Sequence, residues 1–351
     1  MRTNTSLPTR PLGRSGMDIT RIGLGAWAIG GNGWAVGWGQ QDDADSIAAI
    51  RLAVDRGINW IDTAAVYGLG HSEEIVRRAL AQMAPAERPY VFTKCGLTWS
   101  TENPQAMPRR TGAPASIRRE VEDSLRRLGI ERIDLYQMHW PAGDDTPIET
   151  YWQTLLDLKQ EGKVAAVGLS NHNLAQLQDA CGLGQVDSLQ PPFSAIQRGA
   201  GADLIPWCAE HDVGVIVYSP MQSGLLTGGF SAARARALPA DDWRSRNAEF
   251  TSPNLERNLA LADALKPIAE QHGTTVAAVA AAWTLAWPGV TGAIVGARSA
   301  TQVNGLLGAA ELELDSDDLD IIAEAIELTG AGSGPLRPPQ DSGKLPANLF
   351  A

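Results

Sequence analysis

The sequence of 351 residues has few basic residues for its acidic ones, few cysteines and no long apolar run, and each of these shortages excludes a class of protein. Lys and Arg number 29 against 40 Asp and Glu, and the formal charge of −11 argues against a nucleic-acid surface, which needs clustered cations. The only cysteines are Cys95, Cys181 and Cys208, which form no CxxC pair, so neither a disulfide framework nor a zinc cage is expected. The glutamates at 73 and 74 are read as helix-start charges, and we expect no metal.

Long apolar stretches are also missing. No run of about eighteen apolar residues occurs, and the segment from Met1 to Arg10 is polar. We therefore expect neither a membrane segment nor a leader, and a cytoplasmic protein.

The sequence does contain a regular alternation of short apolar segments and amphipathic helices. The apolar segments have the length of buried strands and cover residues 22–25, 58–62, 90–94, 133–139, 164–169, 186–190, 213–218 and 293–295. Eight alternations without a break in composition predict a single (β/α)8 TIM barrel over residues 1–351, with a core at about 11–328. The first strand lacks a G-x-G-x-x-G turn in the usual context, which argues against a doubly wound dinucleotide-binding fold.

Two additions flank the predicted barrel. Gly13 and Gly16 between short apolar flanks indicate a hairpin within residues 10–22. An extra C-terminal helix is expected near 317–328, and the Gly- and Pro-rich stretch 330–351 is predicted to be a tail, either a flap or disordered.

Polar residues follow nearly every predicted strand, where this kind of barrel carries its chemistry. Asp62 closes a buried strand and needs a cation, which Lys94 on the next strand can supply. We expect the same cation to lower the pKa of Tyr67, so that this tyrosine exchanges a proton near neutral pH, while His139 orients a carbonyl group.

Three other features have a structural alternative. Ser72 is most simply a helix cap, and Cys95 should point away from the barrel interior. The tryptophans of the loops either line a substrate pocket or fill the loops themselves, and both interpretations stay open for Trp27, Trp34, Trp38 and Trp140.

Several motifs occur in order on successive strands: Asp62-Thr63-Ala64 with Tyr67-Gly68, Phe92-Thr93-Lys94, Ile133-Asp134-Leu135 with His139, and Gly168-Leu169-Ser170-Asn171. In this order they resemble the aldo-keto reductase superfamily, over about residues 11–328. The Trp-rich first loop and the segments 220–228 and 241–244 look closest to bacterial inositol-operon and general-stress reductases.

The resemblance implies an enzyme that reduces an aldehyde or ketone to the alcohol, reversibly, with NADPH. It implies a catalytic tetrad of Asp62, Tyr67, Lys94 and His139, in which Tyr67 gives the proton as hydride arrives from the nicotinamide. The expected partner is a small carbonyl, sugar or alcohol substrate. The alternative is an NADPH-binding regulatory subunit with little turnover.

The resemblance also implies the cofactor contacts. Ser170, Asn171 and Gln190 would hold the carboxamide, and Phe193 would stack on the nicotinamide where the family usually has a tyrosine. The segment that would wrap the pyrophosphate includes Tyr218, Ser219, Pro220, Gly224 and Leu226. The adenosine-phosphate segment includes Gly296, Arg298 and Gln302.

Arg298 bears on the choice between NADPH and NADH. Paired with a 2′-phosphate it favours NADPH, whereas its structural alternative is a solvated cation at a helix start. Gly305 and Leu306 stand where many members carry an acidic residue and an asparagine, so NADH remains the alternative cofactor.

Overall fold

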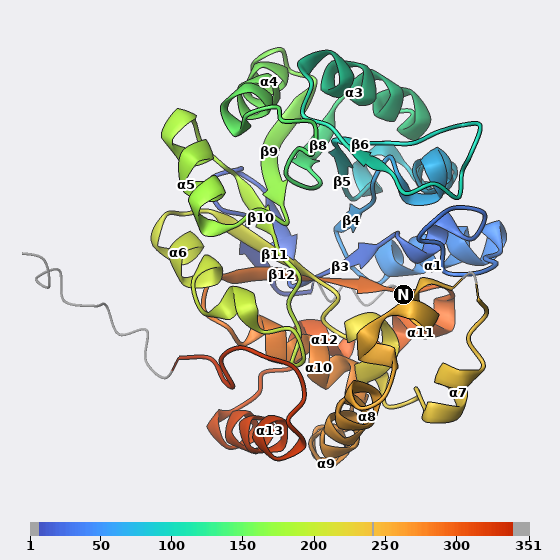
Figure 1. Ribbon diagram of the computed structural model, residues 1–351, viewed down its shortest axis with the longest axis vertical. Helices are drawn as coiled ribbons and strands as arrows, with labels where there is room; N and C mark the ends of the chain where they lie inside the picture. Colours follow the sequence, from blue (N-terminus) through green and yellow to red (C-terminus); the bar gives the residue numbers. More distant parts are fainter. Residues whose placement is uncertain (1–6, 241, 340–351) are drawn as a thin grey trace, which may run out of the picture.

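The computed structural model describes residues 7–240 and 242–339, and its centre is a closed barrel of eight parallel strands (Figure 1). The order around the barrel is β10-β11-β12-β3-β4-β5-β8-β9. This confirms the predicted (β/α)8 TIM barrel. The strands are β3 (Ile22–Gly25), β4 (Trp60–Asp62), β5 (Tyr90–Cys95), β8 (Ile133–Met138), β9 (Val164–Ser170), β10 (Ser188–Gln190), β11 (Gly214–Tyr218) and β12 (Val290–Gly296).

Helices surround the barrel (Figure 1). They pack an apolar stripe against the outer face of the strands, as Ile117 and Val121 of α3 do. The helices are α1 (Asp43–Asp55), α2 (His71–Leu80), α3 (Pro114–Leu128), α4 (Ile148–Gln160), α5 (Leu174–Leu183), α6 (Leu204–Glu210), α7 (Ala232–Arg236), α8 (Asn254–Ala264), α9 (Lys266–Gln271), α10 (Val276–Leu285), α11 (Ala300–Asn304), α12 (Gly308–Glu311) and α13 (Ser316–Thr329).

Two hairpins lie outside the barrel. The first, β1 (Thr9–Pro11) with β2 (Asp18–Thr20), matches the predicted N-terminal hairpin, and its Leu12 and Ile19 are fully buried against the barrel. The second, β6 (Leu97–Thr98) with β7 (Arg109–Arg110), follows β5 and was not predicted.

The inside of the barrel changes from apolar to polar along the strands. Trp60 and Phe92 belong to the inner apolar cluster, and their rings lie 5.2 Å apart. Two residues further along the same strands stand Asp62 and Lys94, because side chains two apart share a face of a strand. Cys95 belongs to the outer cluster between strands and helices, as predicted.

The cap predicted at Ser72 is wrong. The residue before α2 is Gly70, and Ser72 lies inside the helix, fully buried. Its hydroxyl donates to the carbonyl of Ala26 at 2.9 Å and lies 2.9 Å from the Thr63 hydroxyl. The serine therefore ties α2 to two strand ends.

The segment after α13 packs against the loop that follows β10. Ser333 pairs with Gln197 in a bridge, and the Arg198 guanidinium donates to the carbonyl of Ala331 at 3.0 Å. Residues 331–334 are thus held in place, while residues 340–351 of the predicted tail lie outside the described part of the chain.

Candidate active site

A cavity of about 650 Å³ opens at the carboxyl ends of the strands. Its volume is typical of small-molecule sites. The lining includes most residues predicted for a site: Trp27, Trp34, Trp38, Asp62, Tyr67, His139, Trp140, Ser170, Asn171, Gln190, Tyr218, Ser219, Pro220, Gly224, Gly296, Arg298 and Gln302.

Lys94 lies directly behind this lining and meets the buried aspartate. Its Nζ is 2.5 Å from Asp62 Oδ2 and donates to the carbonyl of Thr63 at 2.9 Å. The same Nζ lies 3.4 Å from the Tyr67 hydroxyl. Lys94 and Asp62 are 1% and 3% exposed, so the pair is almost free of solvent screening and strongly coupled.

Tyr67 reaches the cavity from a tight turn between β4 and α2. Gly68 in this turn has φ of 61°, and a Cβ there would come within 2.4 Å of the Gly30 carbonyl oxygen. A larger residue would displace the turn. The glycine pair thus lets the Tyr67 turn sit directly on the first loop.

The predicted shift of the Tyr67 pKa is wrong in sign. Burial raises the pKa of Tyr67 well above its usual value, and the negative charge of Asp62 raises it further. Lys94 does not reverse this, because its charge is already balanced by Asp62 at 2.5 Å. In this structure Tyr67 is therefore a protonated phenol at neutral pH.

His139 stands beside the Tyr67 ring, with the ring centroids 5.7 Å apart and edge to face. Burial lowers the pKa of His139 well below its usual value, and the positive charges of Lys94 and Arg110 lower it further. The imidazole is therefore neutral at neutral pH and can still donate one hydrogen bond.

Gln137 completes the polar layer and was missed from the sequence. Its Nε2 lies 3.5 Å from Asp62 Oδ1, and its Oε1 accepts from Gln190 Nε2 at 3.3 Å. Gln190 Nε2 also donates to Asp62 Oδ1 at 2.9 Å. The available signal was the period of two, since Gln137 follows the inward-facing Leu135.

Next to these residues, the side chains of Asn171, Ser170 and Tyr218 form a hydrogen-bonded group. Asn171 has φ of 62°, and its Oδ1 accepts from the Tyr218 hydroxyl at 2.8 Å. Its Nδ2 donates to the His139 carbonyl at 2.9 Å, and Ser170 donates to the Gln190 carbonyl at 2.9 Å. These bonds fix the orientation of groups that suit an amide ligand.

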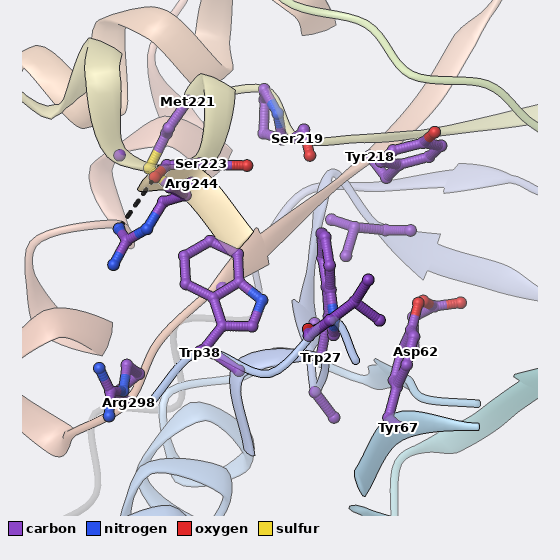
Figure 2. Close-up of a pocket in the computed structure, with 18 of the residues that line it drawn as sticks. Trp27, Trp38, Asp62, Tyr67, Tyr218, Ser219, Met221, Ser223, Arg244 and Arg298 are labelled. Atoms are coloured by element: carbon purple, nitrogen blue, oxygen red, sulfur yellow. Dashed lines mark hydrogen bonds between the residues drawn. The ribbon is translucent and has the colours of Figure 1, made fainter. Parts of the chain in front are cut away.

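The other end of the cavity carries arginines (Figure 2). Arg298 donates to Gln41 Oε1 at 2.6 Å, and its main-chain N–H donates to Gln302 at 2.7 Å. Arg244 pairs with Asp242 at 2.7 Å and lies over the Trp38 ring, 4.7 Å from its centroid. With Arg234 these side chains make this end cationic, and neither Arg234 nor Arg244 was predicted as a site residue.

Comparison with known proteins identifies this arrangement. Residues 21–327 match the sequence model of the Aldo/keto reductase family. The chain belongs to this family. As an aldo-keto reductase it is an oxidoreductase that uses a nicotinamide cofactor for carbonyl reduction.

Relatives of this aldo-keto reductase cover nearly its whole length. It is 34% identical to "Aldo-keto reductase YhdN" of Bacillus subtilis (strain 168), over 90% of this chain and 92% of that protein. It is 33% identical to "NADH-specific methylglyoxal reductase" of Escherichia coli (strain K12), over 90% and 98%. The solved structure of the glycerol dehydrogenase AKR11B4 from Gluconobacter oxydans superposes with a TM-score of 0.82 at 38% identity, covering 95% of this chain and 98% of that one.

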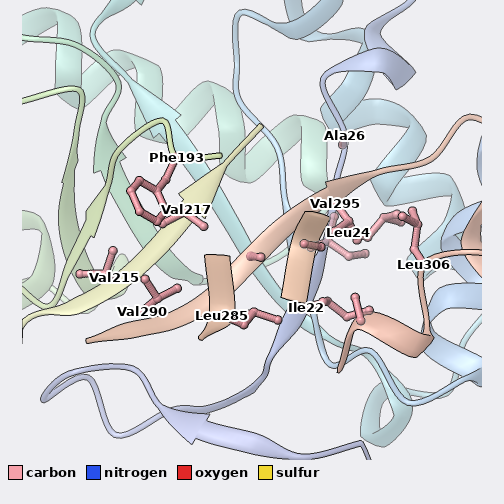
Figure 3. Packing of buried hydrophobic residues seen from close by; sticks show 14 of the residues in the cluster. Ile22, Leu24, Ala26, Phe193, Val215, Val217, Leu285, Val290, Val295 and Leu306 are labelled. Carbon is pink, nitrogen blue, oxygen red and sulfur yellow. The ribbon is translucent and has the colours of Figure 1, made fainter. Parts of the chain in front are cut away.

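Two predicted cofactor contacts of this aldo-keto reductase are wrong. Phe193 is fully buried, absent from the cavity lining and lies in the core beside Val217 (Figure 3). Its ring stacks on that of Trp283, with the centroids 5.5 Å apart. Leu226 is likewise buried in the core and does not line the cavity. Tyr218, at the end of β11, does line the cavity. Both side chains, which the motif suggested as cofactor contacts, are instead packed in the apolar core.

The four tryptophans Trp27, Trp34, Trp38 and Trp140 of the aldo-keto reductase line the cavity, and rings of the first loop also pack against one another. Trp34 lines the cavity but is 3% exposed and donates to the Gly31 carbonyl, so it also fills its loop. Trp27 stacks on Trp243 at 5.3 Å and faces Tyr67 at 6.2 Å. The first loop is therefore packed through its aromatic rings onto the later segment around Trp243.

The described residues contain neither a metal-binding cluster nor a membrane-spanning helix. Between residues 7 and 339, residue 241 aside, no cluster of His, Cys, Asp and Glu is arranged to hold a metal ion. In the same part of the chain, no helix has both the length and the hydropathy needed to cross a bilayer.

Proposed function

We propose that this aldo-keto reductase uses NADPH to reduce an aldehyde or ketone to the alcohol, reversibly, with Tyr67 as the proton donor. The observation that carries the proposal is the Tyr67 hydroxyl in the cavity, 3.4 Å from Lys94 Nζ and beside a neutral His139. A protonated phenol next to a buried ammonium can release its proton to a substrate oxygen as that oxygen gains charge.

Each tetrad residue has a distinct task in this reaction. A bound nicotinamide supplies the hydride, or accepts it in the reverse direction. Tyr67 transfers its proton to the carbonyl oxygen, and the phenolate that results is stabilised by the Lys94 ammonium. His139 donates a hydrogen bond to the same oxygen, while Asp62 holds Lys94 in place.

The cavity has suitable groups for both ends of a nicotinamide dinucleotide. Ser170, Asn171 and Gln190 present the amide and hydroxyl groups that we assign to the carboxamide. At the other end a Cβ at Gly296 would meet nothing within 4 Å, which leaves room for a ligand beside Arg298. The planar guanidinium groups there suit phosphates, and they support NADPH over NADH.

NADH is the alternative cofactor, and the Escherichia coli relative is named as NADH-specific. Initial rates with each cofactor decide between them. We expect a lower KM for NADPH; a lower KM for NADH would overturn the preference while leaving the reaction class intact.

We further propose that the chain works as one cytoplasmic domain with its core at about 11–328. We also place it with the bacterial inositol-operon and general-stress reductases, on the basis of its Trp-rich first loop and segments 220–228 and 241–244.

The proposal is tested by replacing the proton donor. Tyr67→Phe should lower kcat/KM for carbonyl reduction by roughly 10²- to 10⁴-fold, because only the transferable proton is removed. Rates follow the loss of nicotinamide absorbance with a panel of aldehydes and ketones. The control is Tyr90→Phe, at the start of β5 and remote from the cavity lining, which should keep wild-type rates.

Full activity in Tyr67→Phe would exclude this tyrosine as the donor. Tight NADPH binding without turnover of any carbonyl compound by the wild-type enzyme would instead favour the regulatory alternative.

A further inference from the structure

One cation of the cavity has no task in the reaction described above. Arg110 stands at the end of β7 and lines the cavity on the side of His139 and Trp140. Its guanidinium lies over the Trp140 ring, 4.3 Å from the centroid. Among the described residues the Arg110 guanidinium makes no hydrogen bond, so its N–H groups remain available to a ligand.

The backbone under Arg110 is fixed. The Arg110 carbonyl accepts from the Gly143 N–H at 3.2 Å, and the Thr111 N–H donates to the Gly96 carbonyl at 3.0 Å. The hairpin is thus tied to the segment after β8 and to the end of β5. Arg110 is held at a defined place on the rim.

Within residues 7–240 and 242–339, no carboxylate forms an ion pair with Arg110. Asp144, which lines an adjoining surface hollow with Arg110, accepts instead from Thr111 at 2.6 Å and Gly112 at 3.1 Å. Asp62, the carboxylate of the cavity lining, is paired with Lys94. The positive charge of Arg110 is therefore unbalanced at the mouth.

Arg110 is also separated from the cation group assigned to the cofactor. Arg234, Arg244 and Arg298 follow β11 and β12, whereas the Arg110 hairpin and Trp140 follow β5 and β8. In the closed order of strands these two pairs stand on opposite sides of the barrel. A cofactor phosphate bound near Arg298 leaves Arg110 free for a second ligand.

We propose that Arg110 determines specificity by binding a carboxylate or phosphate group of the carbonyl substrate. This inference rests on the proposed function, because it places the reacting carbonyl at Tyr67 and His139. Trp34, Leu97 and Trp140 supply apolar walls around the body of such a substrate. The guanidinium fork then offers two parallel hydrogen bonds to the oxyanion.

The test compares substrates that differ only in charge. The pairs are 4-carboxybenzaldehyde with 4-carbamoylbenzaldehyde, and glyceraldehyde 3-phosphate with glyceraldehyde, each assayed with saturating NADPH. We expect the wild-type enzyme to prefer at least one anion over its neutral partner in kcat/KM. Arg110→Met should lower this anion-to-neutral ratio by about 10- to 100-fold, the usual effect of losing a charged hydrogen bond.

The matched control is Arg109→Met, which removes the same charge from the neighbouring residue; Arg109 borders the adjoining surface hollow but does not line the main cavity. Its anion-to-neutral ratio should stay at the wild-type value. Arg110→Lys should keep part of the preference, since the charge remains but the fork is lost. The KM of the anion should rise with added salt in the wild type and much less in Arg110→Met.

The outcomes separate the two proposals. If neutral aldehydes are reduced but neither anion is preferred, or Arg110→Met and Arg109→Met change the ratio equally, the role of Arg110 is wrong and the reductase assignment stands. If no carbonyl compound is reduced at all, the proposed function itself fails. Preference for only one of the two anions identifies the group as carboxylate or phosphate.

Discussion

Lys94 is shared between two acceptors of unequal strength. Its Nζ is 2.5 Å from a carboxylate oxygen and 3.4 Å from a phenol oxygen. Before the reaction the Asp62 carboxylate balances most of the positive charge of Lys94, so little of this charge acts on Tyr67 and the phenol stays protonated. In the proposed reaction Tyr67 gives up that proton, and the phenolate then becomes a second anion within reach of the same ammonium. The ammonium therefore acts mainly after proton transfer.

The raised pKa of Tyr67 predicts the pH dependence. With Tyr67 as the proposed proton donor, reduction needs its phenol protonated, and a pKa above the usual value of about 10 keeps it protonated through the neutral range. Reduction should therefore show no loss of kcat/KM due to Tyr67 from about pH 7 to about pH 10. Alcohol oxidation needs the phenolate and should rise with pH over the same range.

Steady-state rates in both directions, over this pH range, check the prediction. Tyr67→Phe should lack the rise in the oxidation direction. A loss of reduction centred below about pH 8 that disappears in Tyr67→Phe would show that the tyrosine pKa is lowered instead.

The buried Asp62–Lys94 pair also affects stability. Asp62→Asn leaves Lys94, which is 1% exposed, without its counter-charge. We expect the free energy of unfolding to fall by roughly 3–5 kcal/mol, the usual cost of breaking a buried pair. Denaturant unfolding measures it. Asp123→Asn, which breaks the exposed pair with Arg126, should cost about 1 kcal/mol or less.

A companion variant separates charge from packing. Asp62→Asn combined with Lys94→Met removes both charges and should recover part of the lost stability. A double variant less stable than Asp62→Asn would contradict this account.

At the scale of elements, two segments far apart in the sequence meet at the cavity (Figure 2). Trp38 of the first loop lies edge to face with Trp243 of η6 (Trp243–Arg246) at 5.8 Å, and Trp27 stacks on the same ring at 5.3 Å. Gln41 is hydrogen-bonded to Arg298 beyond β12. The first loop is thus fastened to the segments after β11 and β12.

Loosening this contact should speed release of the cofactor. Trp243→Ala removes ring contacts with Trp27, Trp38 and Phe250, although Trp243 itself is not part of the cavity lining, and we expect the cofactor to dissociate about 10-fold faster. Stopped-flow trapping of the released cofactor measures the rate. Trp207→Ala on α6, which is remote from the cavity, is the control, and equal rates in the two variants would show that the contact does not retain NADPH.

The helices and strands also show which parts of the site can be predicted from the sequence. Strand ends gave most of the site, because a parallel barrel brings the carboxyl ends of all its strands to one mouth. Phe193 and Leu226 were misjudged because a motif gives a position in the chain but not whether the side chain faces the cavity or the core. Arg110 and Arg244 lie on segments whose course is set by contacts distant in sequence, such as Arg244 with Trp38. The pKa of Tyr67 depends on burial, which a neighbouring cation in the sequence does not reveal.

Across the whole molecule, the barrel is closed at one end and open at the other. The N-terminal hairpin buries Leu12 and Ile19 against the amino ends of the strands, in one cluster with Trp60. A Cβ at Gly23 would lie 2.1 Å from the Trp60 ring and one at Gly292 2.9 Å from it, so the indole occupies the space beside both glycines. A packed apolar layer therefore lies directly below Asp62 and Lys94 inside the barrel.

Removing the indole should weaken the whole barrel. Trp60→Ala is expected to lower the free energy of unfolding by roughly 3–5 kcal/mol, because a fully buried ring leaves a cavity among strands that cannot collapse into it. Calorimetry or denaturant unfolding measures the change. Trp207→Ala on a half-buried surface site should cost much less, and equal costs would contradict a tightly filled interior.

The tryptophans around the cavity should make the fluorescence of the enzyme sensitive to cofactor binding. Trp27, Trp34, Trp38 and Trp140 line the cavity, four of the eleven indoles in the chain. Indole emission overlaps the absorption band of a reduced nicotinamide, so energy can pass from these rings to a bound dinucleotide. Binding of the reduced cofactor should therefore quench the intrinsic tryptophan fluorescence of the enzyme, so that binding can be followed without an attached dye.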